Sequence, residues 1–66
     1  MKQYHQRALA LMQAGSVTRE QLPFEGLSEK RDIEPLLAQG YIRAVRSFEW
    51  EITDEGKAAL KQARGW

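Results

Sequence analysis

The stretch from Leu36 to Leu60, LLAQGYIRAVRSFEWEITDEGKAAL, constrains the fold more than any other part of the chain. Gly40 follows a leucine-rich turn, and glycine commonly follows the end of a helix. Two short runs of alternating apolar and polar residues come next, which predicts two β-strands joined by a tight turn. Thr53 then precedes Asp54 and Glu55, and this order is typical of a helix N-terminus. The stretch therefore predicts the end of one helix, a β-hairpin and the start of another helix.

The size and composition of the chain predict a single small domain. Its 66 residues allow one domain, residues 1–66, which buries only about 60% of the surface that the unfolded chain exposes. Cysteine is absent, so a hydrophobic core has to supply the stability that disulfides or thiolate metal sites give to other small proteins. The longest apolar run, Ala8 to Met12, is too short to cross a membrane, and no secretory leader pattern opens the chain. We therefore expect a cytoplasmic protein that does not contact membranes.

The positive charge of the chain is concentrated in its terminal segments. The net charge is +1, and all nine acidic residues lie between Thr18 and Gly56. Outside these limits the charged residues are all basic, and they are Lys2, Arg7, Lys57, Lys61 and Arg64. The last three recur at helical spacing and predict a cationic stripe on the C-terminal helix, whose packing face we assign to Ala59, Leu60 and Ala63.

The N-terminal segment predicts an amphipathic helix from Lys2 to Ala14, which Gly15 ends. The apolar residues at helical spacing are Tyr4, Ala8 and Leu11, joined on the same side by Met1 and Met12. His5 lies at the edge of this face. Because it is the only histidine and the chain has no cysteine, we expect no metal site and no cofactor.

A short second helix is predicted after a brief extended link at Ser16 and Val17. Thr18 to Gln21 reads Thr-Arg-Glu-Gln, the capping-box pattern in which the first and last side chains satisfy free backbone N–H groups. Pro23 disfavours a helical conformation at the residue before it, so this helix has to be short. The apolar residues that we expect in the core here are Leu22, Phe24 and Leu27.

A third helix is predicted from Glu29 to Gln39, with Ser28 as its N-cap. Its inward-facing residues are expected to be Ile33, Leu36 and Leu37. Pro35 leaves two arrangements open. Either it kinks a long helix by removing the bond to the Arg31 carbonyl, at a cost of about 3 kcal/mol, or the helix proper starts after Asp32 with the proline in its first turn. Both arrangements keep the two leucines buried.

Two registers are open for the hairpin. A three-residue loop, Arg46-Ser47-Phe48, pairs Ile42 with Ile52, Arg43 with Glu51, Ala44 with Trp50 and Val45 with Glu49. We favour this register, because it places the apolar side chains on one face and an attractive ion pair on the other. A two-residue loop at Arg46-Ser47 would instead group Tyr41, Val45, Phe48, Trp50 and Ile52.

The same residues resemble winged helix-turn-helix domains, in particular the small bacterial DNA-binding regulators of the MarR type. Leu36 to Ile42 is similar to the end of the family's recognition helix and the start of its wing, and Ile52 to Gly56 is similar to the leucine-threonine-x-x-glycine segment after the wing. Thr18 to Leu22 occupies the place of the helix that braces the recognition helix. The resemblance covers nearly the whole chain. It implies an α+β, mostly helical fold with three helices, a short β-hairpin wing and a C-terminal helix.

The resemblance implies double-stranded DNA as the partner, bound by a monomer or a homodimer, and a role as a transcriptional regulator or accessory DNA-binding factor. Residues matched to the recognition helix, the wing and the bracing helix would contact the DNA, and they are Ser28, Lys30, Arg31, Arg43, Arg46 and Arg19. Arginine can bind phosphate or guanine through two hydrogen bonds, and a helix N-terminus offers N–H donors to an anion.

A second hypothesis is a protein-interaction module that uses the same scaffold, such as a phage or mobile-element protein or a subunit of a larger complex. Acidic residues accompany the bases on the predicted recognition helix and wing, and they oppose phosphate binding; they are Glu29, Asp32, Glu34, Glu49 and Glu51. Its candidate contact residues are the aromatics Phe48, Trp50 and Trp66, of a kind enriched at interface hot spots. No glycine-rich phosphate loop or paired histidines indicate catalysis, so we expect no enzymatic activity.

Overall fold

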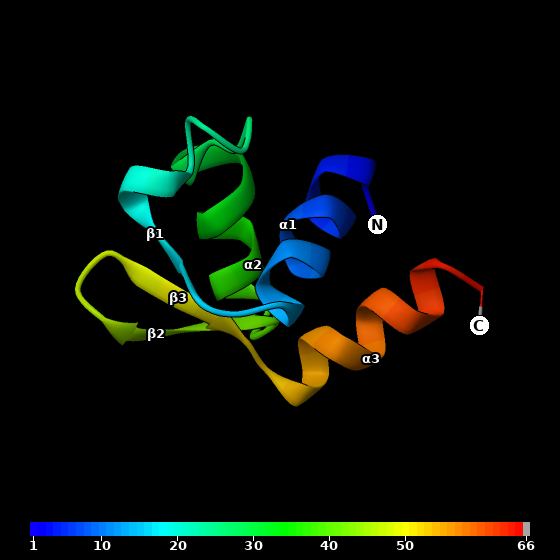
Figure 1. The fold of residues 1–66 in the computed structure, drawn as a ribbon. Coiled ribbons are helices and arrows are strands. Elements are labelled where there is room, and N and C mark those ends of the chain that lie inside the picture. Colours follow the sequence, from blue (N-terminus) through cyan, green and yellow to red (C-terminus); the bar gives the residue numbers. More distant parts are fainter. Residues whose placement is uncertain (66) are drawn as a thin grey trace.

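The computed structural model describes residues 1–65, which form helices and three short strands (Figure 1). The elements in order are α1 (Gln3–Gln13), β1 (Val17–Thr18), the 3-10 turn η1 (Arg19–Gln21), the π-helical segment η2 (Glu29–Ile33), α2 (Glu34–Ala38), β2 (Ile42–Arg46), β3 (Glu49–Ile52) and α3 (Asp54–Ala63). The strands form one antiparallel sheet in the order β1-β3-β2. The predicted α+β class is confirmed.

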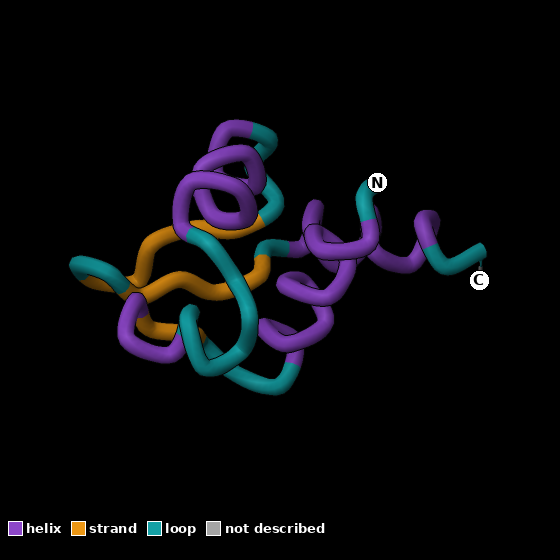
Figure 2. Tube along the Cα trace, turned by 90° about the horizontal axis from the view of Figure 1, so that it is seen from above, coloured by secondary structure: helices purple, strands orange, loops and turns teal. Residues whose placement is uncertain are grey.

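α1 and α3 lie at the end of the molecule opposite the hairpin tip (Figure 1). α2 lies above the sheet in Figure 1, and α1 packs against η2, β3 and α3. Figure 2, seen from above, shows α1 and α3 together at the end of the sheet away from the hairpin tip. Because α3 runs away from the sheet, its last turns extend beyond the rest of the molecule (Figure 1).

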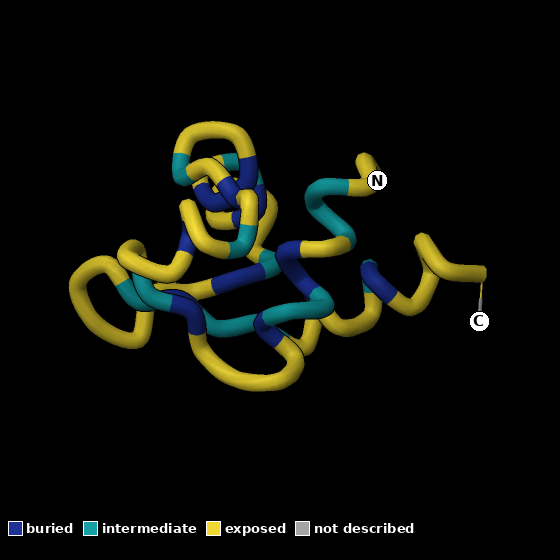
Figure 3. Tube along the Cα trace, turned by 45° about the horizontal axis from the view of Figure 1, so that its top comes forward, coloured by how far each residue is buried: buried dark blue, intermediate teal, exposed yellow. Residues whose placement is uncertain are grey.

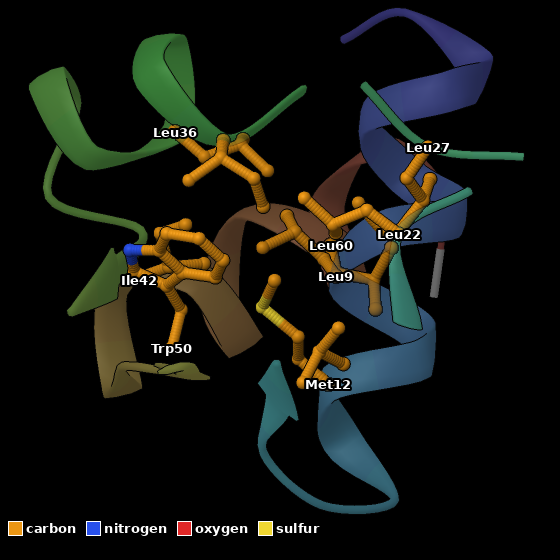
Figure 4. Close-up of a cluster of buried hydrophobic side chains, with 11 residues drawn as sticks. Leu9, Met12, Leu22, Leu27, Leu36, Ile42, Trp50 and Leu60 are labelled. Atoms are coloured by element: carbon orange, nitrogen blue, oxygen red, sulfur yellow. The ribbon is translucent and has the colours of Figure 1, made fainter. Parts of the chain in front are cut away.

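The core joins side chains from every main element (Figure 4). Its buried apolar residues are Ala8, Leu9, Met12, Val17, Leu22, Leu27, Ile33, Leu36, Ile42, Trp50 and Leu60. Leu9 is completely buried although it was not among the residues predicted to face inward, whereas Met1 is exposed and Tyr4 and Leu11 are only partly buried. The reason is that α1 contacts both α3 and β3, which turns a face centred on Ala8, Leu9 and Met12 inward.

Three residues predicted to pack in the core are exposed instead. Phe24 is 89% exposed because it lies in the turn between Pro23 and Gly26, where the chain reverses outside the core. Leu37 is 38% exposed because Ile33 and Leu36 occupy the inward side of their helix. Ala63 is exposed because the end of α3 extends past its packing partner α1.

The predicted extended link before the second helix is part of the sheet. Val17 lies opposite Trp50 and Thr18 opposite Glu49, so β1 adds a third strand next to β3. The helix that follows is the single turn η1, as short as Pro23 requires. The backbone N–H of Thr18 donates to the Gln21 side-chain oxygen at 2.9 Å, as the capping-box pattern predicts.

Pro35 lies in the first turn of α2, as the second of the two predicted arrangements has it. The preceding residues continue the helical path as η2, in which the N–H of Glu34 donates to the Glu29 carbonyl. Gly40 ends α2 with φ +77°, and the next backbone N–H, that of Tyr41, donates to the Leu36 carbonyl at 3.0 Å. This is the glycine helix end that the sequence predicts.

The hairpin has the favoured register over most of its length. The pairs Ile42 with Ile52, Arg43 with Glu51 and Ala44 with Trp50 are confirmed. The predicted pair of Val45 with Glu49 and both predicted loops are wrong, because a β-bulge places Arg46 opposite Glu49 and leaves Ser47 and Phe48 as the loop. Phe48 makes this tight loop possible by adopting φ +59°.

The start of α3 is fixed to the end of α2. The Thr53 hydroxyl accepts from the N–H of Gly56 at 3.1 Å, as an N-cap does, and donates to the Gly40 carbonyl at 2.7 Å. The N–H of Thr53 donates to the Tyr41 carbonyl at 3.0 Å. Gly56 lies against that carbonyl so closely that a Cβ atom built on it would be 2.1 Å from the oxygen. The glycine therefore allows the two segments to approach.

Candidate nucleic-acid interface

The arginines predicted to contact DNA are each paired with a carboxylate of the protein itself. Exposed arginines pair with Glu29 (Arg19, 3.3 Å), Glu49 (Arg46, 3.2 Å) and Glu51 (Arg43, 2.5 Å). The fourth pair joins Arg31 to the buried carboxylate of Asp32 at 2.8 Å. Acidic residues of the chain therefore neutralise the four arginines of η1, η2 and the hairpin one by one, whereas Lys30 of η2 has no such partner among residues 1–65.

Arg31 is held more firmly than the other three. Its guanidinium donates to Asp32 and to the Gly26 carbonyl at 3.1 Å, and it lies 4.5 Å from the centre of the Tyr4 ring on α1. The hydrogen bond to Asp32 raises the pKa of the Arg31 side chain above its ordinary value, so this group is charged at any physiological pH. These contacts make Arg31 a structural link between α1 and η2.

Asp32 is a completely buried charged residue that sequence reasoning placed on the DNA-contacting helix. Its carboxylate accepts from the N–H of Ser28 at 2.7 Å as well as from Arg31. The Ser28 hydroxyl in turn accepts from the N–H of Arg31 at 3.4 Å. The N–H groups of Ser28 and Arg31, at the helix end that was expected to face an anion, are thus engaged within the protein. The signal in the sequence was an aspartate four residues after the predicted N-cap serine, one turn along the helix.

The hairpin tip is fixed to η1. The backbone N–H of Arg19 donates to the Phe48 carbonyl at 2.7 Å, and the Arg19 guanidinium lies 4.7 Å from the centre of the Phe48 ring. The Ser16 hydroxyl, just before β1, donates to the Glu49 carboxylate on β3. An open hollow remains between η1 and the tip, lined by Thr18, Arg19, Phe48 and their neighbours.

The three aromatic residues proposed for a protein interface have different surroundings. Phe48 is 54% exposed at the hairpin tip. Trp50 is only 5% exposed and belongs to the core between Val17 and Ala44, so it cannot contribute to an exposed surface. Trp66 lies outside the described residues. Phe24, which the sequence predicts to be in the core, is more exposed than Phe48.

Several basic residues have no carboxylate partner within residues 1–65. They are Lys2, Arg7, Lys30, Lys57, Lys61 and Arg64. Of the residues predicted to bind DNA, only Lys30 belongs to this group. Most of α3 is exposed (Figure 3), including Lys57, Lys61 and Arg64, which stand at the spacing of the predicted cationic stripe. The uncompensated positive charge therefore lies on the helices and not on the hairpin.

Comparisons with known proteins found no match to a family model, to a curated protein or to a solved structure. In the described part of the chain, no acidic or histidine side chains gather in a group of three or more that could hold a metal ion. Within the same residues, no helix has the length and apolar character needed to span a bilayer.

Proposed function

We propose that this chain is a small DNA-binding protein of the winged-helix type, acting as a transcriptional regulator or an accessory DNA-binding factor. The observation that carries the proposal is the order of the elements around the sheet. A helix closed by Gly40 leads directly into a β-hairpin, and the second strand leads into a helix capped by Thr53. The same order underlies the resemblance to winged helix-turn-helix regulators. The basic residues without a carboxylate partner provide charge that phosphate can neutralise.

The exposed ion pairs of Arg19, Arg43 and Arg46 do not oppose this function strongly. The side chains of these arginines are between 57% and 79% exposed. Exposed pairs typically contribute less than about 1 kcal/mol, so a phosphate can replace a glutamate as the partner of the arginine at small cost. Arg31 differs, because freeing it would leave the buried carboxylate of Asp32 without its charged partner.

The test is a titration of the wild-type protein into a fluorescently labelled DNA duplex of random sequence, followed by anisotropy. We expect binding at low salt whose log K falls linearly with log salt, because contacts with phosphate release counterions. Unlabelled duplex should displace the labelled duplex. The proposal is wrong if the wild-type protein shows no binding at the lowest salt concentration.

A second function, a protein-interaction module, is favoured by the conformation of Phe48. Among residues 1–65 it is the one non-glycine residue with a positive φ, and its ring is more than half exposed. A bulky side chain in this region costs about 1–2 kcal/mol, and glycine would occupy the position without that cost. A strained, exposed aromatic residue at the tip of a hairpin is a feature of contact sites.

For this second function we expect Phe48→Gly to leave the free energy of unfolding unchanged or to raise it by up to about 1 kcal/mol. Relief of the backbone strain should offset the lost contact with Arg19, which is worth about 0.5–1 kcal/mol at an exposed site. Urea denaturation followed by circular dichroism measures the change, with Ser47→Ala in the same loop as the control. A clear loss of stability would show that Phe48 serves the fold, and would remove the observation that favours a protein partner.

A further inference from the structure

The cationic stripe of α3, formed by Lys57, Lys61 and Arg64, follows one side of the helix. The residues are spaced i, i+4 and i+7, which places their side chains within a narrow arc of the helix surface. All three are exposed, and none has a carboxylate partner in the described chain. The two acids of α3, Asp54 and Glu55, are both in its first turn. The stripe therefore presents charge of one sign.

The helix dipole accounts for only part of this stripe. Cations stabilise a helix near its C-terminal end, and the effect is lost beyond the last turn. Lys61 and Arg64 fit this role. Lys57 does not, because it is the fourth residue of α3 and lies near the positive end of the dipole. The helix dipole therefore does not explain why Lys57 lies in line with the other two cations.

The position of α3 makes the stripe accessible to a large ligand. The helix leaves the sheet and extends past α1, and its C-terminal residues are exposed (Figures 1 and 3). Between the stripe and α1 lies a shallow depression lined by Gln13 and Leu60 together with the three cations. The hairpin tip and its neutralised arginines lie at the other end of the molecule (Figure 1).

The length of the stripe fits the spacing of phosphates in a nucleic acid strand. Lys57 and Arg64 are separated by seven residue steps, which span about 10 Å at a rise of about 1.5 Å per residue. A strand of B-DNA advances about 3.4 Å along its axis for each phosphate, so about 10 Å corresponds to three steps, which join four successive phosphates. The three cations can thus face phosphates within a run of four on one strand.

We propose that α3 contacts the phosphate backbone of double-stranded DNA through Lys57, Lys61 and Arg64, and that this helix supplies more of the phosphate contacts than the hairpin. The inference rests on the proposed DNA-binding function and locates its main electrostatic surface. It differs from the resemblance, in which the recognition helix and the wing make these contacts. The cations of α3 have no carboxylate partner in residues 1–65, whereas four of the expected arginines do. Even where a phosphate replaces a glutamate at small cost, the glutamate stays close to the phosphate and repels it, so the net attraction is weaker there than at α3.

The experiment compares two variants that lose the same number of positive charges. The first carries Lys57→Gln, Lys61→Gln and Arg64→Gln, and the second carries Arg19→Gln, Arg43→Gln and Arg46→Gln. All six side chains are exposed, and circular dichroism with thermal melting checks that both variants fold. Binding of a labelled random-sequence duplex is then measured between about 50 and 200 mM salt.

We expect the slope of log K against log salt to fall in magnitude by about 2.7 in the α3 variant, because each lost phosphate contact removes about 0.9. The hairpin variant should change the slope by less than half of this amount. If the hairpin variant loses as much binding as the α3 variant, or more, the inference is wrong although the proposed DNA-binding function stands. If the wild-type protein does not bind the duplex at all, the proposed function itself fails.

A further measurement separates DNA from another anionic surface. Vesicles of phosphatidylcholine with anionic phosphatidylserine are titrated with the wild-type protein and with the α3 variant. Stripe-dependent binding to these vesicles without binding to the duplex would overturn the inference. Binding to the duplex with little affinity for the vesicles supports it.

Discussion

Gly56→Ala is expected to destabilise the protein by about 2–4 kcal/mol, a large part of the stability that a domain of this size has. The new Cβ atom would lie 2.1 Å from the Tyr41 carbonyl oxygen and 2.8 Å from a side-chain carbon of Ile52. The oxygen belongs to the backbone and accepts the N–H of Thr53, so it cannot move without breaking the connection between α2 and α3. Alanine would otherwise stabilise a helix relative to glycine, by about 1 kcal/mol.

Urea denaturation followed by circular dichroism measures this effect. Gln62→Ala, at an exposed position of the same helix, is the matched control and should change the stability by less than about 0.5 kcal/mol. If the Gly56→Ala variant were as stable as the control, α3 could not lie as close to the Tyr41 carbonyl as described.

Asp32→Ala is expected to cost about 2–4 kcal/mol through the loss of a buried carboxylate. The substitution removes the acceptor of the Ser28 N–H and of the Arg31 guanidinium at the start of η2. The N–H would lose its partner in a part-buried position, and the link from η2 to α1 through Arg31 would weaken.

Two further variants test the cause of this loss. Asp32→Asn keeps an oxygen that can accept from Ser28 but removes the charge, so we expect it to be less harmful than alanine. Glu34→Ala removes an exposed acid two residues away and should have little effect. Thermal melting of the three variants ranks them. Equal melting temperatures for Asp32→Ala and Glu34→Ala would contradict the role assigned to the buried carboxylate.

Features that depend on local backbone chemistry could be predicted from the sequence. Gly40 ends α2 because glycine adopts a positive φ readily, and Thr53 caps α3 because its hydroxyl accepts a free N–H group. The pairing of Ile42 with Ile52 follows from the alternation of apolar side chains. The helix end, the N-cap and the strand pairing each depend on residues that lie close together in the sequence.

Features that depend on distant packing could not be predicted. A strand of two residues, such as β1, is too short to show an alternation of apolar and polar residues in the sequence. Val17 belongs to a strand only because β3 lies beside it. The burial of Leu9 depends on where α3 and β3 meet α1. The exposure of Phe24 depends on the path of a turn outside the core.

The same distinction applies to the candidate site. The pair of Arg43 with Glu51 was predictable from the hairpin register. The pair of Arg46 with Glu49 depends on the bulge at Val45, and the pair of Arg31 with Asp32 depends on the burial of the carboxylate, so neither could be predicted. The stripe on α3 was predictable, because helical spacing alone determines it. Its separation from the neutralised arginines depends on the direction in which α3 leaves the sheet (Figure 1).

The pairing of β1 with β3 has a consequence for how the domain folds. Ser16 and Glu49, which hydrogen-bond beside this pairing, are 33 positions apart in the chain, and the segment between them contains η1, η2, α2 and β2. Closing a loop of this length costs entropy that is recovered only when the intervening helices are packed. The sheet and the core should therefore form in one cooperative step. A fragment of the chain that lacks β1 or β3 should not fold into the remaining part of this structure.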